Sequence, residues 1–501
     1  MLRWKWGQKL VAVGVLVVML LLPLVGLAKP LYPLEPETLF ELLKGSYRYQ
    51  EDGWWFLHIE GEPFARGFQY GFYMGPEIEQ SIALLKDYYA QDNQPWQLYR
   101  SIAEKMIWNK VPHEYQRQLE GIVAGVQTRG YEVDIWDITA SNARYDISYY
   151  LGYLKNNKLP IPQEFGDYTV ATPGIYAAID SFLAKQAESC SAFAATGAAT
   201  LTGEMILGHN TWTNYALAKL GENIIVHETP TSGHEILYQP YVGGIWSGRD
   251  WLMSGAGLVV AETTNPGMSS WYDVNGIPVF VRSRQATQYA DNIDEWVKIM
   301  VEKNNGAYSN HWLVGDAKNN EIAALDLGLK KYDVQRTKSG FIGSCNFPQT
   351  EAIRSETTYD YTKPEGSYWR FERWNQLKKQ YYGKITVELG KEFLADHYDA
   401  MKKEYGPDVR RTLCGHGELG GGTSGAVDGK VTSASLAKEM KFWARFGHPC
   451  GTPISSTEYF AQYPDKNAWL KPWNFSMPVQ EWTVLGPRGE GGKLKETPHN
   501  R

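Results

Sequence analysis

The change of sequence pattern at Cys190 limits the fold of this chain more than any other feature. Before it, from about residue 31 to 150, apolar residues recur at helical spacing, as Leu119, Ile122 and Val126 do. After it, short apolar runs bounded by turn residues predominate, a pattern typical of strands. A mostly helical segment followed by strands, helices and further strands predicts an α+β fold of packed sheets with outer helices.

Several elements can be predicted individually. Residues 54–59 and 257–264 have the apolar content of strands, and a helix is predicted over about residues 287–304. Gly67 and Gly71 predict a helix that closely approaches a sheet, because glycine has no side chain to hold the two apart. Gly121 and Gly125, four residues apart, predict a second close-packing surface.

Cys190 stands among small residues at the head of a β-prone run, in Glu188-Ser189-Cys190-Ser191-Ala192-Phe193. This arrangement predicts a hairpin that begins with a thiol nucleophile, released as a new first residue by cleavage between Ser189 and Cys190. The freed α-amino group, with an unperturbed pKa of about 7.7–8.0, would then act as the base for the thiol. The competing interpretation is a buried structural cysteine in a strand, which spacing alone favours.

Residues 1–28 are predicted to be a targeting segment. Three basic residues precede an almost wholly apolar run that ends in Gly26 and Ala28, small residues suited to cleavage before Lys29. The run is also long enough to serve as an uncleaved membrane anchor. In either case we expect an exported protein, in which residues 29–189 form a mostly helical N-terminal chain or pro-segment and residues 190–501 form the catalytic chain.

Composition narrows the possible partners. The chain of 501 residues has a net charge of −6 and shows no basic stripe beyond its N-terminus, so we expect no nucleic-acid partner. Membrane contact is expected only through the N-terminal segment or a lipid substrate. The 32 Tyr, 19 Trp and 17 Phe could line an apolar or sugar-binding cleft, although packing in the core is their usual use.

The remaining cysteines are Cys345, Cys414 and Cys450. Cys414-Gly415-His416 and His448-Pro449-Cys450 are mirror-image contexts, and a disulfide between Cys414 and Cys450 is the expectation for an exported protein. The alternative is a metal site of these two cysteines and two histidines, although a one-residue ligand spacing is tight for zinc. Cys345 would then be a buried thiol.

From Arg66 almost to its end, the chain resembles the phospholipase B-like proteins. It is similar more broadly to the C45-type self-processing acyltransferases and hydrolases, which include penicillin acyltransferase and belong to the N-terminal nucleophile (Ntn) hydrolases. The stretches that carry the resemblance are Arg66-Gly67-x-x-x-Gly71, Glu120-Gly121-Ile122-x-x-Gly125, Cys190-Ser191-Ala192, Gly208-His209-Asn210-Thr211-Trp212, residues 255–264, Asn304-Asn305-Gly306-x-Tyr308, His416-Gly417, residues 425–433 and Cys450-Gly451-Thr452-Pro453.

The resemblance implies a four-layer αββα sandwich, cleavage before Cys190, and attack of the Cys190 thiol on an acyl amide or ester through a thioester. It implies no cofactor and no metal, and it implies that the two chains stay associated after cleavage. His209 and Asn210 fall where related hydrolases place an Arg-Asn pair beside the nucleophile. His209 is therefore expected to orient or polarise the groups at the nucleophile. Trp212 falls where relatives carry an aspartate that holds the α-amine, which leaves the partner of that amine open.

Three further residues are carried over from the resemblance. Thr264 lies near the oxyanion-side asparagine of the relatives, with Asn265 beside it. Asn346 is the preferred oxyanion donor, with a loop-capping role as the alternative. Arg370 matches a structural or catalytic arginine, with Arg373 as the second choice and a solvated helix face as the alternative.

The substrate class stays open on the sequence. The name of the family implies a phospholipid acyl ester, whereas the chemistry of the fold favours amides such as N-acyl compounds. An acyltransferase would differ only in passing the acyl group to an amine rather than to water. A non-catalytic lipid- or carbohydrate-binding protein and an unprocessed structural paralogue are the alternatives from other classes.

Overall fold

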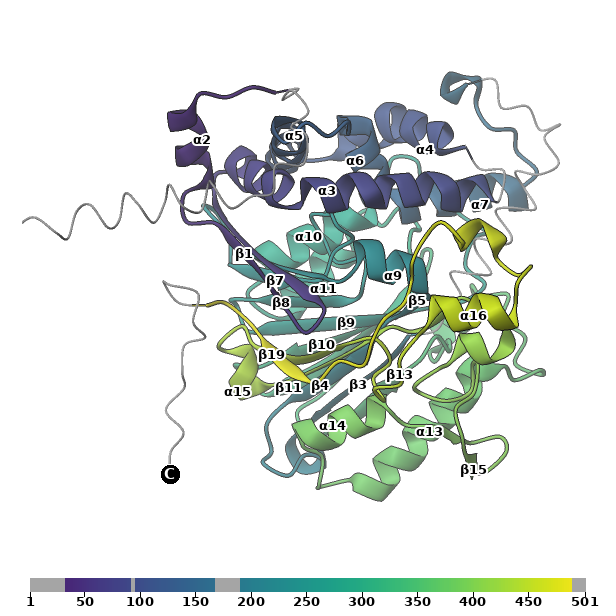
Figure 1. Ribbon diagram of the computed structural model, residues 1–501. Coiled ribbons are helices and arrows are strands. Elements are labelled where there is room, and N and C mark those ends of the chain that lie inside the picture. Colours follow the sequence, from purple (N-terminus) through teal and green to yellow (C-terminus); the bar gives the residue numbers. More distant parts are fainter. Residues whose placement is uncertain (1–31, 92–94, 167–189, 489–501) are drawn as a thin grey trace, which may run out of the picture.

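The computed structural model describes residues 32–91, 95–166 and 190–488, and within them two sheets lie stacked between helices (Figure 1). The larger sheet has nine strands in the spatial order β1 (Tyr47–Glu51), β2 (Trp54–Gly61), β6 (Ile224–Pro230), β7 (Ile236–Tyr238), β8 (Trp251–Ser254), β9 (Leu258–Thr264), β10 (Asn310–Asp316), β11 (Glu321–Leu327) and β12 (Tyr332–Thr337). It is antiparallel except where β2 pairs with β6.

The second sheet has six strands, in the order β13 (Gly340–Ser344), β3 (Ser191–Thr196), β4 (Ile206–Asn210), β17 (Asp428–Ser433), β18 (Phe442–Phe446) and β19 (Thr483–Leu485). Strands β3 and β4 face β9 and β10 of the larger sheet, so the two sheets share one buried interface. Two small ribbons complete the β-structure: β5 (Trp212–Asn214) with β16 (Ser424–Ala426), and β14 (Tyr398–Asp399) with β15 (Glu404–Tyr405).

Helices cover both outer faces (Figure 1). The larger sheet is covered by α3 (Pro63–Ala90), α10 (Val279–Tyr289) and α11 (Ile293–Val301), with α5 (His113–Thr128) and α9 (Tyr215–Gly221) packed on α3. The smaller sheet is covered by α13 (Gly366–Tyr381) and α14 (Val387–Leu394). The architecture is therefore the predicted α+β, four-layer αββα sandwich.

The other helices are α2 (Pro36–Leu43), α4 (Trp96–Ile102), α6 (Ile135–Asn142), α7 (Arg144–Asn156), α12 (Glu351–Arg354), α15 (Ala434–Ala437) and α16 (Ser456–Gln462).

The glycines of α3 pack against another helix and not against a sheet, which corrects the sequence-based expectation. A Cβ at Gly67 would overlap the carbonyl oxygen of Gln118 in α5, and one at Gly71 would overlap that of Ile122. Gly121 and Gly125 of α5 approach the backbone of α3 in the same way. The four glycines therefore let the two helices touch along their backbones.

The predicted helix over residues 287–304 is two helices in the structure. Helix α10 begins earlier, at Val279, and ends at Tyr289, and α11 starts anew at Ile293. The side chain of Asn292 accepts a hydrogen bond from the backbone N–H of Glu295 and so caps the second helix, which accounts for the break. The predicted strands at 54–59 and 257–264 are confirmed as β2 and β9.

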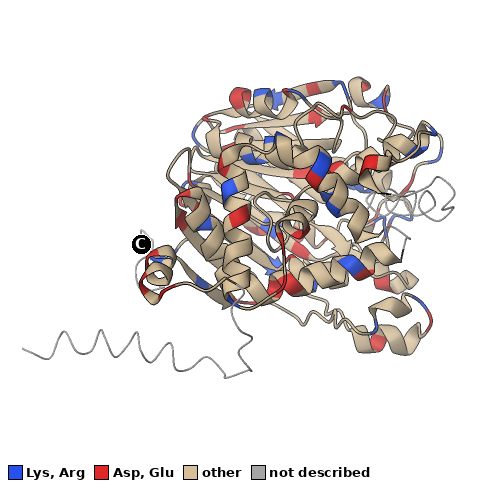
Figure 2. Ribbon diagram, turned by 90° about the horizontal axis from the view of Figure 1, so that it is seen from above, with Lys and Arg blue, Asp and Glu red and all other residues tan. Residues whose placement is uncertain are grey.

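The predicted targeting segment, residues 1–28, lies outside the described residues. Over the part of the chain that is described, no helix has the length and apolar content needed to cross a membrane. Acidic and basic residues are interspersed over the helices seen from above, so this face carries charges of both signs (Figure 2).

Candidate active site around Cys190

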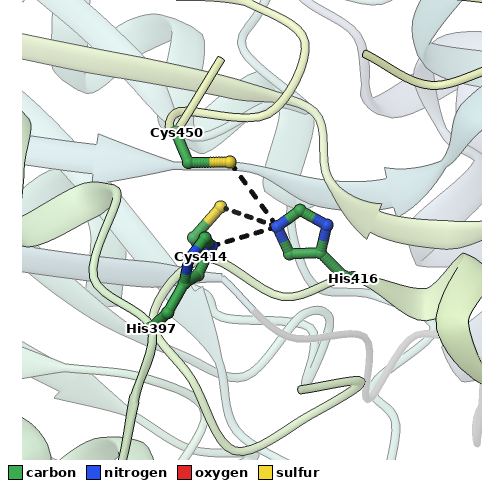
Figure 3. Close-up of side chains that lie close together, drawn as sticks. All are labelled: His397, Cys414, His416 and Cys450. Atoms are coloured by element: carbon green, nitrogen blue, oxygen red, sulfur yellow. Dashed lines mark hydrogen bonds between the residues drawn. The ribbon is translucent and has the colours of Figure 1, made fainter. Parts of the chain in front are cut away.

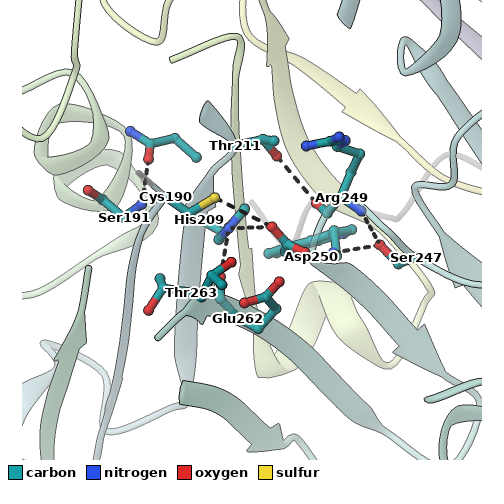
Figure 4. A network of polar contacts seen from close by, with 12 residues as sticks. Cys190, Ser191, His209, Thr211, Ser247, Arg249, Asp250, Glu262 and Thr263 are labelled. Carbon is teal, nitrogen blue, oxygen red and sulfur yellow. Dashed lines mark hydrogen bonds and ion pairs between the residues drawn. The ribbon is translucent and has the colours of Figure 1, made fainter. Parts of the chain in front are cut away.

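Cys190 directly precedes β3, where the two sheets meet, and only 4% of its surface is exposed. Its thiol donates a hydrogen bond to Asp250 Oδ2 at 3.4 Å (Figure 4). Asp250 comes from the segment just before β8, and its φ of +65° holds it in the left-handed region, which aspartate tolerates better than most residues. The nucleophile candidate is therefore paired with a carboxylate 60 residues away in the sequence.

The main chain at Cys190 is fixed from two sides. Arg370 of α13 is fully buried, and its guanidinium donates to the carbonyl oxygen of Cys190 at 2.6 Å and to Ser191 Oγ at 3.1 Å. Asn210 at the end of β4 accepts a hydrogen bond from the backbone N–H of Ser191 through Oδ1, at 2.9 Å. Asn210 also donates to the carbonyl oxygen of Leu413, at 2.8 Å, which ties the nucleophile strand to a distant loop.

Asn346 lies beside this arginine, on the segment that follows β13. Its Oδ1 accepts from Arg370 at 3.4 Å, and its Nδ2 donates to the carbonyl oxygen of Thr264 at 2.8 Å. Because Nδ2 carries two hydrogens, one remains for another acceptor. The φ of Asn346 is +58°, a conformation that asparagine adopts more readily than most residues.

His209 of β4 is completely buried and pairs across the hairpin with Ala192. Its Nε2 lies 3.1 Å from the carbonyl oxygen of Glu262 and 3.8 Å from Asp250 Oδ2 (Figure 4). Burial, and then the nearby Lys430 charge, lower the pKa of His209 well below its usual value, so the ring is neutral. A neutral ring whose Nε2–H donates to a main-chain carbonyl is held in one orientation, with its lone pair on Nδ1.

Two buried carboxyls, Asp250 and Glu262, lie side by side under the thiol (Figure 4). Burial raises the pKa of both groups, and the neighbouring Asp250 raises the pKa of Glu262 further. The hydroxyl of Tyr308 donates to Glu262. The pair therefore holds its proton on Glu262, and Asp250 is the carboxylate that accepts from the thiol.

The Cys190 thiol is itself in its protonated form. Burial raises its pKa well above the ordinary value, and the charge of Asp250 adds to that, while the backbone N–H of Trp212 acts in the opposite direction. Attack by this sulfur therefore needs a base that removes the proton. No lysine or neutral histidine among the described residues makes a hydrogen bond to this sulfur.

Two hollows adjoin one another near the nucleophile, which lines the smaller of them. A small cavity of about 60 Å³ is lined by Cys190, Asp250 and several aromatic and apolar side chains, among them Leu85, Tyr145, Leu217, Tyr241 and Tyr308. A larger groove of about 740 Å³ is lined by Asn346, Arg410 and the glycine-rich segment from Gly420 to Gly425. Both are lined by Trp212 and Asn214 of β5, so the two hollows lie beside each other along this strand.

The structure brings together Cys190, His209, Asn210, Asn346, Thr264 and Arg370, the six residues proposed from the sequence as catalytic. Thr264 takes part through its carbonyl oxygen, which holds Asn346, and its hydroxyl donates to Tyr308 at 3.2 Å. Arg373 instead forms an ion pair with Asp396, at 2.7 Å. Ser189, the other half of the predicted cleavage site, lies outside the described residues.

Trp212 occupies the position where the resemblance implied an aspartate that holds the α-amine. Its ring packs against the guanidinium of Arg370, whose carbon lies 4.8 Å from the ring centre. Sequence reasoning missed Asp250 and gave Glu262 no role, although Glu262 falls in a motif that supported the resemblance. The only local signal at Asp250 is its position after Gly248-Arg249 and before a strand, which many turns share.

The predicted disulfide between Cys414 and Cys450 is wrong for this structure, in which both are free thiols. Each sulfur instead faces the ring of His416, at 3.5 Å from Cys414 and 3.6 Å from Cys450. Cys345 is also free and is buried, as predicted.

A family model described as Phospholipase B matches residues 77–480. The chain belongs to the phospholipase B family. An uncharacterized protein of Archaeoglobus fulgidus is 25% identical over 384 residues, which cover 71% of this chain and 60% of that protein. Phospholipase B-like protein F of Dictyostelium discoideum is 32% identical over 123 residues, covering 23% of this chain and 22% of that protein.

Bos taurus Phospholipase B-like 1 is 24% identical over 271 residues, covering 48% of this chain and 50% of that protein. This phospholipase B family member therefore spans at most 60% of the length of these relatives. Among solved structures, a mutant of conjugated bile acid hydrolase from Clostridium perfringens matches with 11% identity and a TM-score of 0.31, covering 51% of this chain and 89% of that one.

Proposed function

We propose that this chain is an exported, self-processed hydrolase that cleaves an acyl ester or amide with Cys190 as an N-terminal nucleophile. The observation that carries the proposal is the setting of Cys190: a buried thiol at the start of a central strand, in the wall of a cavity, with its main chain held by Arg370. Membership of the phospholipase B family supports an acyl bond as the target.

Before any turnover, water hydrolyses the peptide bond between Ser189 and Cys190, which leaves the carboxylate of Ser189 and frees the α-amine of Cys190. This amine takes the proton of the Cys190 thiol, which the buried setting otherwise retains. The sulfur then attacks the acyl carbonyl carbon. The negative charge that develops on the oxygen is stabilised by the remaining N–H of Asn346 Nδ2, which lines the adjoining groove.

Collapse of this intermediate breaks the bond to the leaving group, which departs as an alcohol or amine after taking the proton from the α-ammonium. The product on the protein is a thioester at Cys190. Water, activated by the same amine, then hydrolyses the thioester and releases the carboxylic acid. Asp250 positions the sulfur by accepting its hydrogen bond, and His209 is oriented by its contact with the carbonyl oxygen of Glu262.

The two hollows suggest how a substrate would lie. The cavity beside the thiol, of about 60 Å³, has leucine and tyrosine side chains in its walls together with Arg144, Arg249 and Asp250, so it suits a small acyl group. The larger groove, lined by glycines and by Asn346, suits the polar leaving group, such as a phospholipid head group or an amino acid.

The experiment traps the thioester. Protein is mixed briefly with a phosphatidylcholine or with an N-acyl amino acid of the same short acyl chain, quenched in acid and analysed by mass spectrometry. We expect an acyl adduct on the peptide that begins at Cys190, removed by hydroxylamine, from at least one substrate. Cys345→Ser should keep the adduct and Cys190→Ala should lack it.

Asn346→Asp keeps the shape of the side chain but removes the donor, so it should slow adduct formation by about 10²–10³. Release of free acid identifies a hydrolase, and transfer of the acyl group to an added amine identifies an acyltransferase. Saturable binding of both substrates without any adduct would contradict a covalent mechanism and favour a binding protein.

A further inference from the structure

Four side chains outside the active site converge on one point: His397, Cys414, His416 and Cys450 (Figure 3). His397 lies between α14 and β14, Cys414 and His416 precede a short 3-10 turn at Gly417–Gly420, and Cys450 follows β18. Cys414 and His416 are buried, and His397 and Cys450 are partly buried. Their four ligand atoms all lie within 4.8 Å of one another.

The distances fit a tetrahedral metal ion. His416 Nε2 lies 3.1 Å from His397 Nε2, 3.5 Å from Cys414 Sγ and 3.6 Å from Cys450 Sγ. Zinc bonds of about 2.3 Å to sulfur and about 2.0–2.1 Å to nitrogen, at tetrahedral angles, put nitrogen and sulfur about 3.6 Å apart and two nitrogens about 3.4 Å apart.

Hydrogen bonds alone do not satisfy this arrangement. Three neighbours point at one ring nitrogen, His416 Nε2, which has either one hydrogen or one lone pair in its plane and so can make one good bond (Figure 3). A cation at the centre would take the lone pair of each imidazole and each thiolate at once. The chemistry of the four groups therefore indicates a metal ligand set.

The outer contacts are those of a metal site as well. The other ring nitrogen of His416, Nδ1, lies 2.9 Å from Glu418 Oε1, the carboxylate–histidine contact that orients metal-binding imidazoles. Cys450 Sγ accepts from the backbone N–H of Thr452 at 3.5 Å and donates to its hydroxyl oxygen at 3.2 Å, a contact that a metal-bound thiolate would make as the acceptor. These contacts turn both ligands toward the centre.

We infer that His397, Cys414, His416 and Cys450 bind one structural zinc ion. Two thiolates and two neutral imidazoles are a preferred set for zinc, and four protein ligands leave no open position for catalysis. His448, the histidine that the sequence pattern offered, is not a ligand, because its Nε2 lies 3.4 Å from Glu418 Oε1 and its ring packs on His416. The distant His397 takes its place, so that only Cys414 and His416 keep the one-residue spacing.

The site would hold the loop that supports the nucleophile strand. Leu413, next to Cys414, supplies the carbonyl oxygen to which Asn210 donates, and Asn210 in turn accepts from Ser191. The backbone N–H of Cys414 bonds to the carbonyl oxygen of Asp396, next to His397. The ion would therefore join three separate segments at the edge of the active site without touching the substrate.

The test uses the full chain, produced with zinc in the medium and without added reductant. Elemental analysis after gel filtration should give one zinc per chain in the wild type and in Cys345→Ser, whose buried thiol lies elsewhere. Cys414→Ser and, should that variant fold poorly, His397→Gln should each lose most of the zinc. Replacement of zinc by cobalt should give thiolate-to-cobalt charge-transfer absorption in the wild type and not in Cys414→Ser.

Peptide mapping under non-reducing conditions tests for the alternative, a disulfide between the two cysteines. A Cys414–Cys450 disulfide in the native protein, or a wild-type zinc content no higher than that of His397→Gln, would overturn the inference. None of these readouts depends on hydrolase activity, so the zinc site and the proposed function can fail separately.

Discussion

At the scale of single residues, the chemistry depends on how far the protein raises the pKa of the Cys190 thiol. Burial and the carboxylate of Asp250 both act in this direction. A thiol held protonated in the folded protein is unreactive until a base reaches it, which is the task assigned to the α-amine. Asp250 thus restrains the nucleophile as well as positioning it.

Asp250→Asn should therefore lower the pKa of Cys190. The expected shift is about one unit, since a charged neighbour within hydrogen-bond distance commonly moves a pKa by one to three units. Asparagine also tolerates the φ of +65° at this position. The measurement is the rate of alkylation of Cys190 by iodoacetamide as a function of pH, followed by peptide mapping.

Cys345 serves as an internal control in that map, because burial raises its pKa to about 12 and its surroundings include neither carboxyl. An unchanged or raised midpoint for Cys190 in the variant would show that Asp250 does not control the thiol.

The same residues mark the limit of inference from sequence. Cys190 and Asn210 could be proposed because they fall in motifs shared with a known family, and Asn346 and Arg370 because of positions that resemble those of its site residues. Asp250 could not, since its contact with Cys190 depends on how the two sheets stack and no local pattern records that. His397 was missed for a similar reason: it is 17 residues from Cys414, and only the loop after α14 brings it there.

At the scale of elements, the contact between α3 and α5 depends on four glycines. Gly71→Ala should destabilise the protein by about 3 kcal/mol, because its Cβ would meet a carbonyl oxygen of α5 that cannot move independently of the helix. Urea unfolding would measure this. Gly75→Ala, in the same helix, is the matched control, because its Cβ would meet the edge of the Tyr131 ring at 3.0 Å, which can shift. Equal effects of the two changes would contradict the packing argument.

Helices α3 and α10 are joined to β6 by a buried ion cluster. Glu228 of β6 lies 2.6 Å from Arg66 Nε and accepts from Arg284 at 2.9 Å. Burial alone would raise the pKa of Glu228, but Arg284 and Arg66 outweigh it and lower the pKa to about 2. Glu228→Gln leaves the buried Arg284 without its carboxylate and Arg66 with only the more exposed Glu114, so it should cost about 3–5 kcal/mol in urea unfolding near neutral pH.

The free energy of unfolding that Glu228 contributes depends on pH. The folded pKa lies below the unfolded value of about 4.3, so the stability gained from Glu228 is complete above that pH and is lost as the pH falls toward 2. The difference between wild type and Glu228→Gln should shrink over this window. Glu114→Gln, which removes a more exposed partner of Arg66, should cost far less. A difference that grows on acidification would refute the assignment.

Element types were largely predictable, and element contacts were not. Strands β2 and β9 have local patterns that identify them, whereas the break between α10 and α11 depends on one capping residue, Asn292, inside an otherwise helical stretch. The glycines of α3 predicted a close contact with another element. Whether that element is a sheet or a helix depends on how the layers pack together, which the local sequence does not show.

At the scale of the whole molecule, the segments on either side of Cys190 form one sandwich. Strand β2 pairs with β6 over seven residue pairs, and α3 covers the sheet that both segments build. After cleavage the two chains should therefore coelute in gel filtration in native buffer and separate only in denaturant. Their separation in dilute native buffer would show that the larger sheet does not hold them together.

The central claim is that Cys190 becomes a free N-terminus. The most direct measurement is intact mass and N-terminal sequencing of the purified wild type beside Cys190→Ala. We predict a fragment that begins Cys190-Ser191-Ala192 in the wild type and one unbroken chain across residues 189 and 190 in the variant. A wild-type chain that stays whole across this bond, also after incubation at acidic pH, would contradict the account.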